Sequence, residues 1–219
     1  ATGTNGIDLA GNTNAVTVNL GTGADTVILS GAADDVNLSS TASVDTLEYT
    51  ATTSTTLIPS VSNFAFGTGG DIINIDLNEE EAANAHTTGR STDIVDGNAA
   101  AVASTATVKE VSGATTLAAG DDLLVFTRTT YTAAELLTAV EGGGDTITTA
   151  TAFADADALL AMYSDGTDMY LAMITYVNAG GAATAWDTGD ACEVKNLMKF
   201  EGVTSISSGD IATGDVVIV

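Results

Sequence analysis

The chain has 219 residues, 45% of them hydrophobic and 5% aromatic, with 29 acidic residues against five basic ones and a net charge of −24. Phosphate binding needs clustered Lys and Arg, so this charge excludes nucleic acid as a partner. The apolar content is too high for a disordered chain, yet no apolar run is long enough to span a membrane.

Self-repulsion of this charge destabilises a compact state unless cations neutralise it. The acidity therefore has two interpretations, solubility and specific cation binding.

The single cysteine, Cys192, cannot form an internal disulfide and is interpreted as a small buried residue. An exported form would need another stabilising element, such as a metal ion. The missing initiator Met and signal peptide predict a processed product or a fragment.

The first 37 residues repeat with a period of nine. From residue 2 the successive units are TGTNGIDLA, GNTNAVTVN, LGTGADTVI and LSGAADDVN. The eighth position is aliphatic each time: Leu9, Val18, Val27 and Val36. This pattern predicts a coil in which each unit gives one short strand and one tight loop. Its aliphatic residues stack inside, because a single unit cannot bury its own.

The repeat then weakens and partly returns. Asp45 keeps the spacing of an Asp two residues before an aliphatic, and Gly67 to Ile73 restores most of the unit. The Thr-rich stretch from Thr46 to Leu57 alternates enough to predict further strands. Pro59 is expected at a turn or a sheet edge.

From residue 77 the pattern predicts a mixed β-region with short helices. Helices are expected over residues 78–87, where an Asn N-cap precedes three Glu, over 132–140, where Thr132 and Glu135 form a capping box, and over 153–162. Strands are expected over 105–111, 123–129, 194–200 and 215–219, with a hairpin that joins 170–177 to 182–186. We therefore predict an all-β fold with a few short helices, divided into residues 1–76 and 77–219.

Two segments resemble the repeat G-G-x-G-x-D-x-aliphatic-x of RTX (repeats-in-toxin) proteins. They are Gly21-Thr22-Gly23-Ala24-Asp25-Thr26-Val27 and Gly67-Thr68-Gly69-Gly70-Asp71-Ile72-Ile73. The resemblance implies an N-terminal parallel β-roll, a β-solenoid that holds calcium (Ca2+) between its loops. Calcium prefers six to eight oxygen ligands, and glycine loops can turn carbonyls onto the ion. The implied metal ligands are Gly21, Gly23, Asp25, Asp34, Asp45, Gly67, Gly69 and Asp71.

The C-terminal part resembles the uncleaved export signal of type I secreted proteins. The residues that carry this resemblance are 164–171, 193–197, 200–203 and 209–211. With the Ala- and Thr-rich composition, they look most like RTX-type bacterial S-layer proteins. The resemblance implies an extracellular or cell-surface protein that assembles with copies of itself, with cell-surface polysaccharide as a further partner. The apolar tail from Val216 to Val219 is expected to add as an edge strand to a neighbour.

The repeat departs from the family pattern in its spacing. If a full turn takes 18 residues, Asp25 faces Ile7 and Ser43, and Asp34 faces Val16 and Thr52. Complete family-type sites are then not assured. The expectation is one or two ions, with Asn5, Asn14, Asp8 or Asp45 completing the ligand set. A repeat that has lost its metals remains the alternative.

No catalytic residue is predicted, and we expect no enzyme. His86 is the only histidine, a zinc site would lack partners, and no H-E-x-x-H motif occurs. The pairs Asp165/Asp168 and Asp187/Asp190 are expected to form turns rather than a glycosidase site. The alternatives to a self-assembling structural protein are an export and folding module of a larger secreted protein, a calcium-dependent adhesin, and, least favoured, a carboxylate hydrolase.

Overall fold

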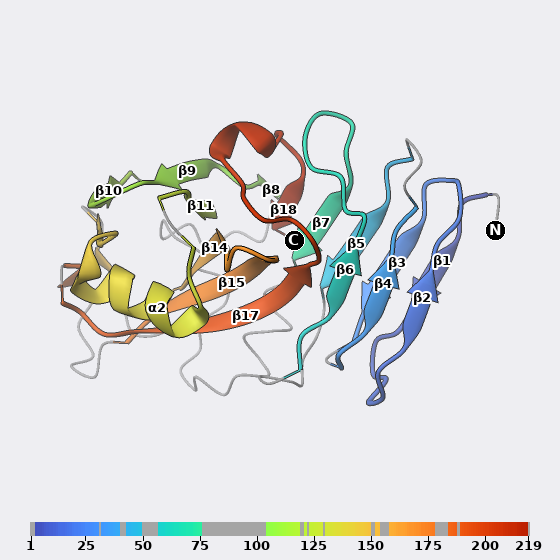
Figure 1. The fold of residues 1–219 in the computed structure, drawn as a ribbon, viewed down its shortest axis with the longest axis horizontal. Coiled ribbons are helices and arrows are strands. Elements are labelled where there is room, and N and C mark those ends of the chain that lie inside the picture. The colour runs from blue at the N-terminus through green and yellow to red at the C-terminus, as the bar shows by residue number, and fades with distance from the viewer. Residues whose placement is uncertain are drawn as a thin grey trace.

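The structure is a computed structural model. It describes residues 3–30, 32–39, 43–49, 57–75, 104–118, 121, 123–128, 130–149, 152–153, 158–177, 184–187 and 189–218. Within these residues the fold is all-β with little helix, as predicted (Figure 1). The helical elements of the described part are the α-helix α2 (Ala133–Thr138), the π-helical turn η1 (Ala139–Gly143) and the 3-10 turn η2 (Ser208–Asp210).

Seven short strands follow one another in the N-terminal part. They are β1 (Gly6–Asp8), β2 (Thr17–Asn19), β3 (Thr26–Leu29), β4 (Asp35–Asn37), β5 (Thr46–Tyr49), β6 (Ser60–Ser62) and β7 (Ile72–Ile75). The odd-numbered strands pair in parallel in one sheet, and β2, β4 and β6 pair in parallel in another. The chain therefore changes sheet with every strand. Figure 1 shows these strands stacked at one end of the molecule.

Aliphatic side chains fill the space between these two sheets. One row contains Ile7, Val27, Leu47 and Ile73, which are register partners, and the other contains Val18, Val36 and Val61. All except Ile7 are at most 7% exposed. Alternate side chains of a strand point to one face, so the three-residue strands turn their central residue to this core and the four-residue strands β3, β5 and β7 turn their second and fourth residues to it. Each such burial contributes about 1.5–3 kcal/mol.

The predicted nine-residue repeat is confirmed for the middle of this region and wrong at its edges. Thr17, Thr26 and Asp35, which begin β2, β3 and β4, lie nine residues apart. The loops before β2 and β5 are longer, so Ile7 rather than Leu9 pairs with Val27. A longer loop leaves the strand pairing intact, because the added residues remain outside the ladder of hydrogen bonds.

The C-terminal part extends both sheets. Its strands are β8 (Ser104–Thr105), β9 (Val108–Val111), β11 (Leu123–Phe126), β14 (Ala158–Ser164), β15 (Met169–Tyr176), β17 (Cys192–Phe200) and β18 (Val216–Ile218). The strand orders are β1-β3-β5-β7-β18-β8 and β2-β4-β6-β17-β15-β14-β11-β9. Two further pairs are β10 (Thr115–Leu117) with β12 (Ile147–Thr149), and β13 (Ala152–Phe153) with β16 (Thr184–Ala185).

Strands from the C-terminal part cover the edges of β6 and β7. β17 pairs in parallel with β6, and β18 pairs in parallel with β7. Phe64, Phe66 and Phe200 pack together there, with ring centroids 4.5–5.3 Å apart. The C-terminal tail was expected to be free for a neighbour. That expectation is wrong, because β18 lies between β7 and β8 of its own chain.

Two other local predictions are wrong. The expected helix over 153–162 is replaced from residue 158 by β14, whose residues are all buried between β11 and β15. A continuous apolar run suits a strand covered on both faces as well as a buried helix. The expected hairpin of 170–177 with 182–186 does not form. β15 pairs with β14 and β17, and β16 pairs with β13.

Several local predictions are confirmed. The Thr132–Glu135 capping box is present at the start of α2, and strands cover all or part of the predicted segments 105–111, 123–129, 194–200 and 215–219. The expected helix over 78–87, with His86, lies outside the described residues, as do residues 50–56.

Candidate cation site

A row of acidic and amide side chains lies where the chain enters the odd-numbered strands. Asn5, Asp25, Asp45 and Asp71 each directly precede one of β1, β3, β5 and β7. The register of these strands places the four residues beside one another across the sheet. We call this row the Asp column.

The members of the Asp column are linked by hydrogen bonds. The backbone N–H of Asn5 donates to Oδ1 of Asp25 (2.7 Å), that of Asp25 to Oδ1 of Asp45 (2.9 Å), and that of Asp45 to Oδ1 of Asp71 (2.9 Å). Asn5 and Asp25 are 20 residues apart, as are Asp25 and Asp45. The expected 18-residue spacing, which placed Ile7 and Ser43 beside Asp25, is therefore wrong at this edge.

Two carboxylate oxygens in the column have no hydrogen-bond partner. Asp25 is 1% exposed and Asp45 is 0% exposed, and the Oδ2 atom of each is buried and unpartnered. Burial raises the pKa of Asp45 above its usual value, and the nearby carboxylates of Asp71 and Asp25 add to this rise. A buried anionic oxygen without a donor is costly. The arrangement is therefore one that a cation would stabilise.

The other predicted ligands divide between this edge and the opposite one. Gly21 and Gly23 lie in the loop that enters β3, and Gly67 and Gly69 lie in the loop that enters β7. Asp34 directly precedes β4 and bonds to Ser30, which directly follows β3, so it lies at the other end of β3 from Asp25. Its Oδ1 accepts the Val16 N–H (3.1 Å), while Oδ2 accepts the N–H (3.1 Å) and Oγ–H (2.7 Å) of Ser30. The structure therefore does not bring Asp34 together with the Asp column.

Asp215 was missed as a site residue by sequence reasoning. It precedes β18, and its charge helps to raise the pKa of Asp71, for which burial is the larger cause. Its Oδ2 accepts the N–H groups of Gly67 (2.7 Å) and Ala212 (2.8 Å). An Asp followed by aliphatic residues also occurs at Asp71, and this signal would have identified Asp215.

Gly23 permits two loops of the N-terminal part to approach each other closely. Its φ is +135°, and a Cβ atom there would lie 2.6 Å from the carbonyl oxygen of Gly3. Gly11 also has a positive φ, +76°, but a Cβ atom there meets nothing within 4 Å. The two glycines therefore separate the cost of a positive φ from the cost of a close contact.

Gly23→Ala is expected to destabilise the protein more than Gly11→Ala. The positive φ costs each variant about 1–3 kcal/mol, and Gly23→Ala also forces residues 3 and 23 apart. We expect an additional loss of about 1 kcal/mol or more, in the range known for overpacking, measured by urea denaturation. Equal losses in the two variants would show that the close approach has no energetic importance.

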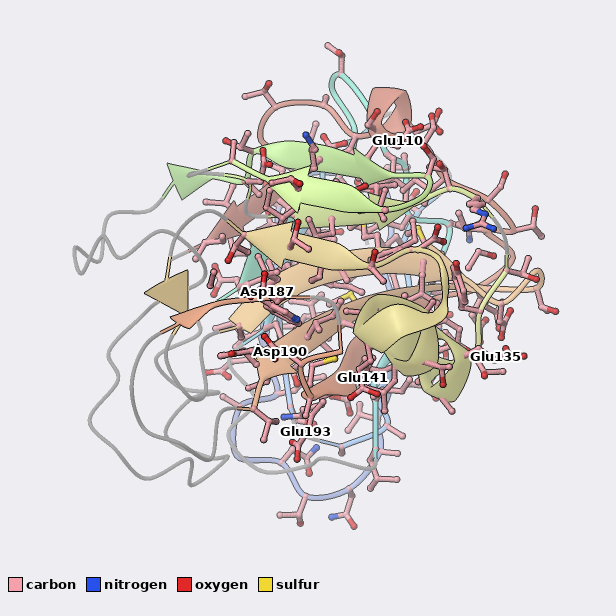
Figure 2. The ribbon with its side chains drawn as sticks, turned by 90° about the vertical axis from the view of Figure 1, so that its left-hand side faces the viewer. Glu110, Glu135, Glu141, Asp187, Asp190 and Glu193 are labelled. Carbon is pink, nitrogen blue, oxygen red and sulfur yellow. The ribbon has the colours of Figure 1, made fainter. Side chains whose placement is uncertain are left out.

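The acidic pairs of the C-terminal part form turns, as expected. Oδ1 of Asp165 accepts the N–H groups of Thr167 and Asp168, both at 2.8 Å. Oδ2 of Asp190 accepts the Asp187 N–H at 2.8 Å. Figure 2 shows that acidic side chains of this end come from separate elements, namely Glu110, Glu135, Glu141, Asp187, Asp190 and Glu193. Their described contacts are with N–H and hydroxyl groups of the protein and do not point to a ligand.

A second buried carboxylate, Asp145, lies far from the Asp column in the sequence. It is 0% exposed and accepts hydrogen bonds from the Tyr131 hydroxyl and from Nη1 of Arg128 (3.1 Å). Arg128 also donates to the carbonyl of Gly144 (3.0 Å). This carboxylate is fully paired by protein groups, which distinguishes it from Asp25 and Asp45.

Among the described residues, no three His, Cys, Asp or Glu side chains come together as a metal-binding group. A cation at the Asp column would therefore need main-chain oxygens or water beside two carboxylates.

In the described part of the chain, no helix is long and apolar enough to cross a membrane. Comparison with known proteins gives no match to a family model, to a curated protein or to a solved structure.

Proposed function

We propose that this chain is a calcium-dependent extracellular structural protein without catalytic activity. In this proposal it leaves a bacterial cell by type I secretion and assembles with copies of itself into a surface layer or fibre. The N-terminal part, residues 1–76, is an RTX-like parallel β-roll. The observation that carries the proposal is the Asp column, with two buried, unpartnered carboxylate oxygens in a chain of net charge −24.

The chemistry of the column suits calcium. Calcium binds carboxylate, carbonyl and water oxygens at about 2.3–2.6 Å and tolerates irregular geometry. Adjacent strands of a sheet lie about 4.7–4.9 Å apart, so an ion of this size can contact carboxylates on two neighbouring strands. Asp25 and Asp45, with backbone oxygens of their loops, would hold the ion. Bound calcium would supply positive charge to a buried anionic pair.

The charge of the chain favours folding after export. Ligand that binds only the folded state adds stability in proportion to the logarithm of its concentration. In a cytoplasm with little calcium, self-repulsion keeps the chain loose, which suits passage through a narrow channel. Outside the cell, calcium neutralises the column and the chain folds.

Open sheet edges support self-assembly. β1 and β2 are the outermost strands of their two sheets in the described part of the chain. Half-buried apolar residues lie in these strands or directly after them, including Ile7, Leu9 and Leu20. Unpaired strand edges are templates for pairing with another chain. Copies of the protein, and cell-surface polysaccharide as a further partner, are the proposed partners.

Purified full-length chain is expected to assemble when calcium is added and to disperse when a chelator is added. Electron microscopy would show sheets or filaments, and light scattering would follow their formation; magnesium at equal concentration is the control. A chain that binds calcium but stays monomeric would favour the export and folding module instead. Calcium-dependent binding to polysaccharide without assembly would favour the adhesin. A chain that does not bind calcium would contradict the proposal.

A further inference from the structure

We infer that Asp25 and Asp45 share one cation, and that the glycine-rich loop of residues 67–71, despite its resemblance to a calcium-binding repeat, holds none. This inference rests on the proposed function and assigns its site to two residues. It departs from the family pattern, which implies a ligand at Asp71 as much as at Asp25.

The case for the Asp25–Asp45 pair rests on unsatisfied oxygens. In both residues Oδ1 accepts a backbone N–H from the preceding member of the column, while Oδ2 is buried without a partner. The Asn5 side chain closes one end of this pair, since its Nδ2 donates to Oδ1 of Asp25 and to the carbonyl of Gly3, both at 2.7 Å. The two unpartnered oxygens thus belong to neighbouring strands, β3 and β5.

At the loop of residues 67–71, by contrast, the carboxylate of Asp71 and two nearby carbonyls already accept backbone N–H groups. Oδ1 of Asp71 accepts the Asp45 N–H (2.9 Å), and Oδ2 accepts the Ala65 N–H (2.8 Å). The carbonyls of Ala65 and Gly67 accept the N–H groups of Asp71 and Gly70, both at 2.7 Å. The loop is tightly closed, because a Cβ atom on Gly70 would lie 2.2 Å from the Ala65 oxygen. These four oxygens therefore already accept backbone N–H groups.

Asp34 and Asp215, the other buried carboxylates near the ends of these strands, also accept hydrogen bonds from protein donors. Both oxygens of Asp34 accept protein donors, and Oδ2 of Asp215 accepts two N–H groups. A backbone N–H stabilises a carboxylate without a metal ion. Among the described residues, only Asp25 and Asp45 have a buried carboxylate oxygen without a hydrogen-bond partner.

Asn substitutions test this assignment, because Asn can keep the accepting oxygen and place an amide where the unpartnered oxygen was. Calcium binding to the full chain is measured by isothermal titration calorimetry, with terbium luminescence as a second probe. We expect Asp25→Asn and Asp45→Asn each to bind one ion fewer than the wild type. The double variant should lose no more than either single variant, since the two residues share the ion.

Asp71→Asn and Asp34→Asn are the matched controls and should keep the wild-type number of ions. If Asp71→Asn fails to fold by circular dichroism, Asp34→Asn alone provides the control, and unfolding of Asp25→Asn in a chelator provides a second measurement. In a chelator, Asp25→Asn should be at least as stable as the wild type. Addition of calcium should not stabilise it further.

Loss of an ion in Asp71→Asn or Asp34→Asn while Asp25→Asn keeps the full number would overturn this inference and leave the proposed function standing. Loss of one ion in each single variant and of two ions in the double variant would also overturn it. A wild-type chain that binds no calcium would instead contradict the proposed function itself.

Discussion

In a calcium chelator, the free energy of unfolding is expected to fall as the pH rises above about 3.8. Burial raises the pKa values of Asp45 and Asp71 in the folded protein above the usual 3.8. Between 3.8 and the raised values, the folded state binds more protons than the unfolded state. The contribution of these two groups to the free energy of unfolding is therefore fully present below about pH 3.8. It is lost as the pH rises through their folded-state pKa values.

Calcium is expected to reverse this trend, because it binds the ionised carboxylates and competes with protons. At a calcium concentration 100 times its dissociation constant, the folded state gains about 2.7 kcal/mol. For a chain of this size, that gain corresponds to a rise of about 5–10 °C in Tm. The measurement is thermal unfolding by circular dichroism at several pH values, with calcium or with chelator.

Asp45→Asn is the control for this experiment. It removes one of the two titrating groups, so the decline of stability with pH in chelator should become shallower. Asp35, an exposed acidic residue beside Asp34, provides a second control, since Asp35→Asn should leave the decline unchanged. A decline as steep in Asp45→Asn as in the wild type would contradict the raised pKa of Asp45.

Asp145→Ala is expected to cost about 3 kcal/mol of stability, with or without calcium. The substitution leaves the buried Tyr131 hydroxyl without its acceptor and takes a charged partner from Arg128. An unsatisfied buried polar group costs about 1–3 kcal/mol, and the loss of a hydrogen bond to a charged group adds a similar amount. The Arg128 side chain is 54% exposed and can reach water, which limits its share of the loss. Urea denaturation measures the change.

A double-mutant cycle separates the two parts of this cost. Tyr131→Phe alone removes one hydrogen bond to a charged acceptor and is expected to cost about 1.5–3 kcal/mol. In the Asp145→Ala background the same change removes an unpaired hydroxyl and should cost nothing or add stability. Additive effects of the two substitutions would show that the pair is not energetically coupled. Asp35→Ala is the exposed control, with an expected change within about 0.5 kcal/mol.

Several features of the fold could be predicted from local sequence alone. The aliphatic positions Val18, Val27 and Val36 repeat every nine residues, and all three are buried between two sheets whose N-terminal strands pair in parallel. The Thr132–Glu135 capping box began the helix that it predicted. These predictions succeed because strand alternation and helix capping depend on residues a few positions apart.

Pairing between distant segments could not be predicted in the same way. Residues 158–162 form a strand instead of the expected helix, because β11 and β15 lie on either side of it. The tail that was expected to be free is β18, paired with β7. A run of apolar residues shows that a segment is buried and leaves open which segments bury it.

The sequence by itself determined the class of fold, the aliphatic core of the repeats and the acidic residues from which a site can be made. Only the tertiary structure decided which carboxylates are neighbours. Loop lengths set the register, so Asp25 lies between Asn5 and Asp45 at a spacing of 20 residues instead of 18. The structure also decided which oxygens accept backbone N–H groups, because several of those donors lie 20 or more residues away. That is why Asp71 is satisfied by protein donors, whereas Asp25 and Asp45 each keep one unpartnered oxygen.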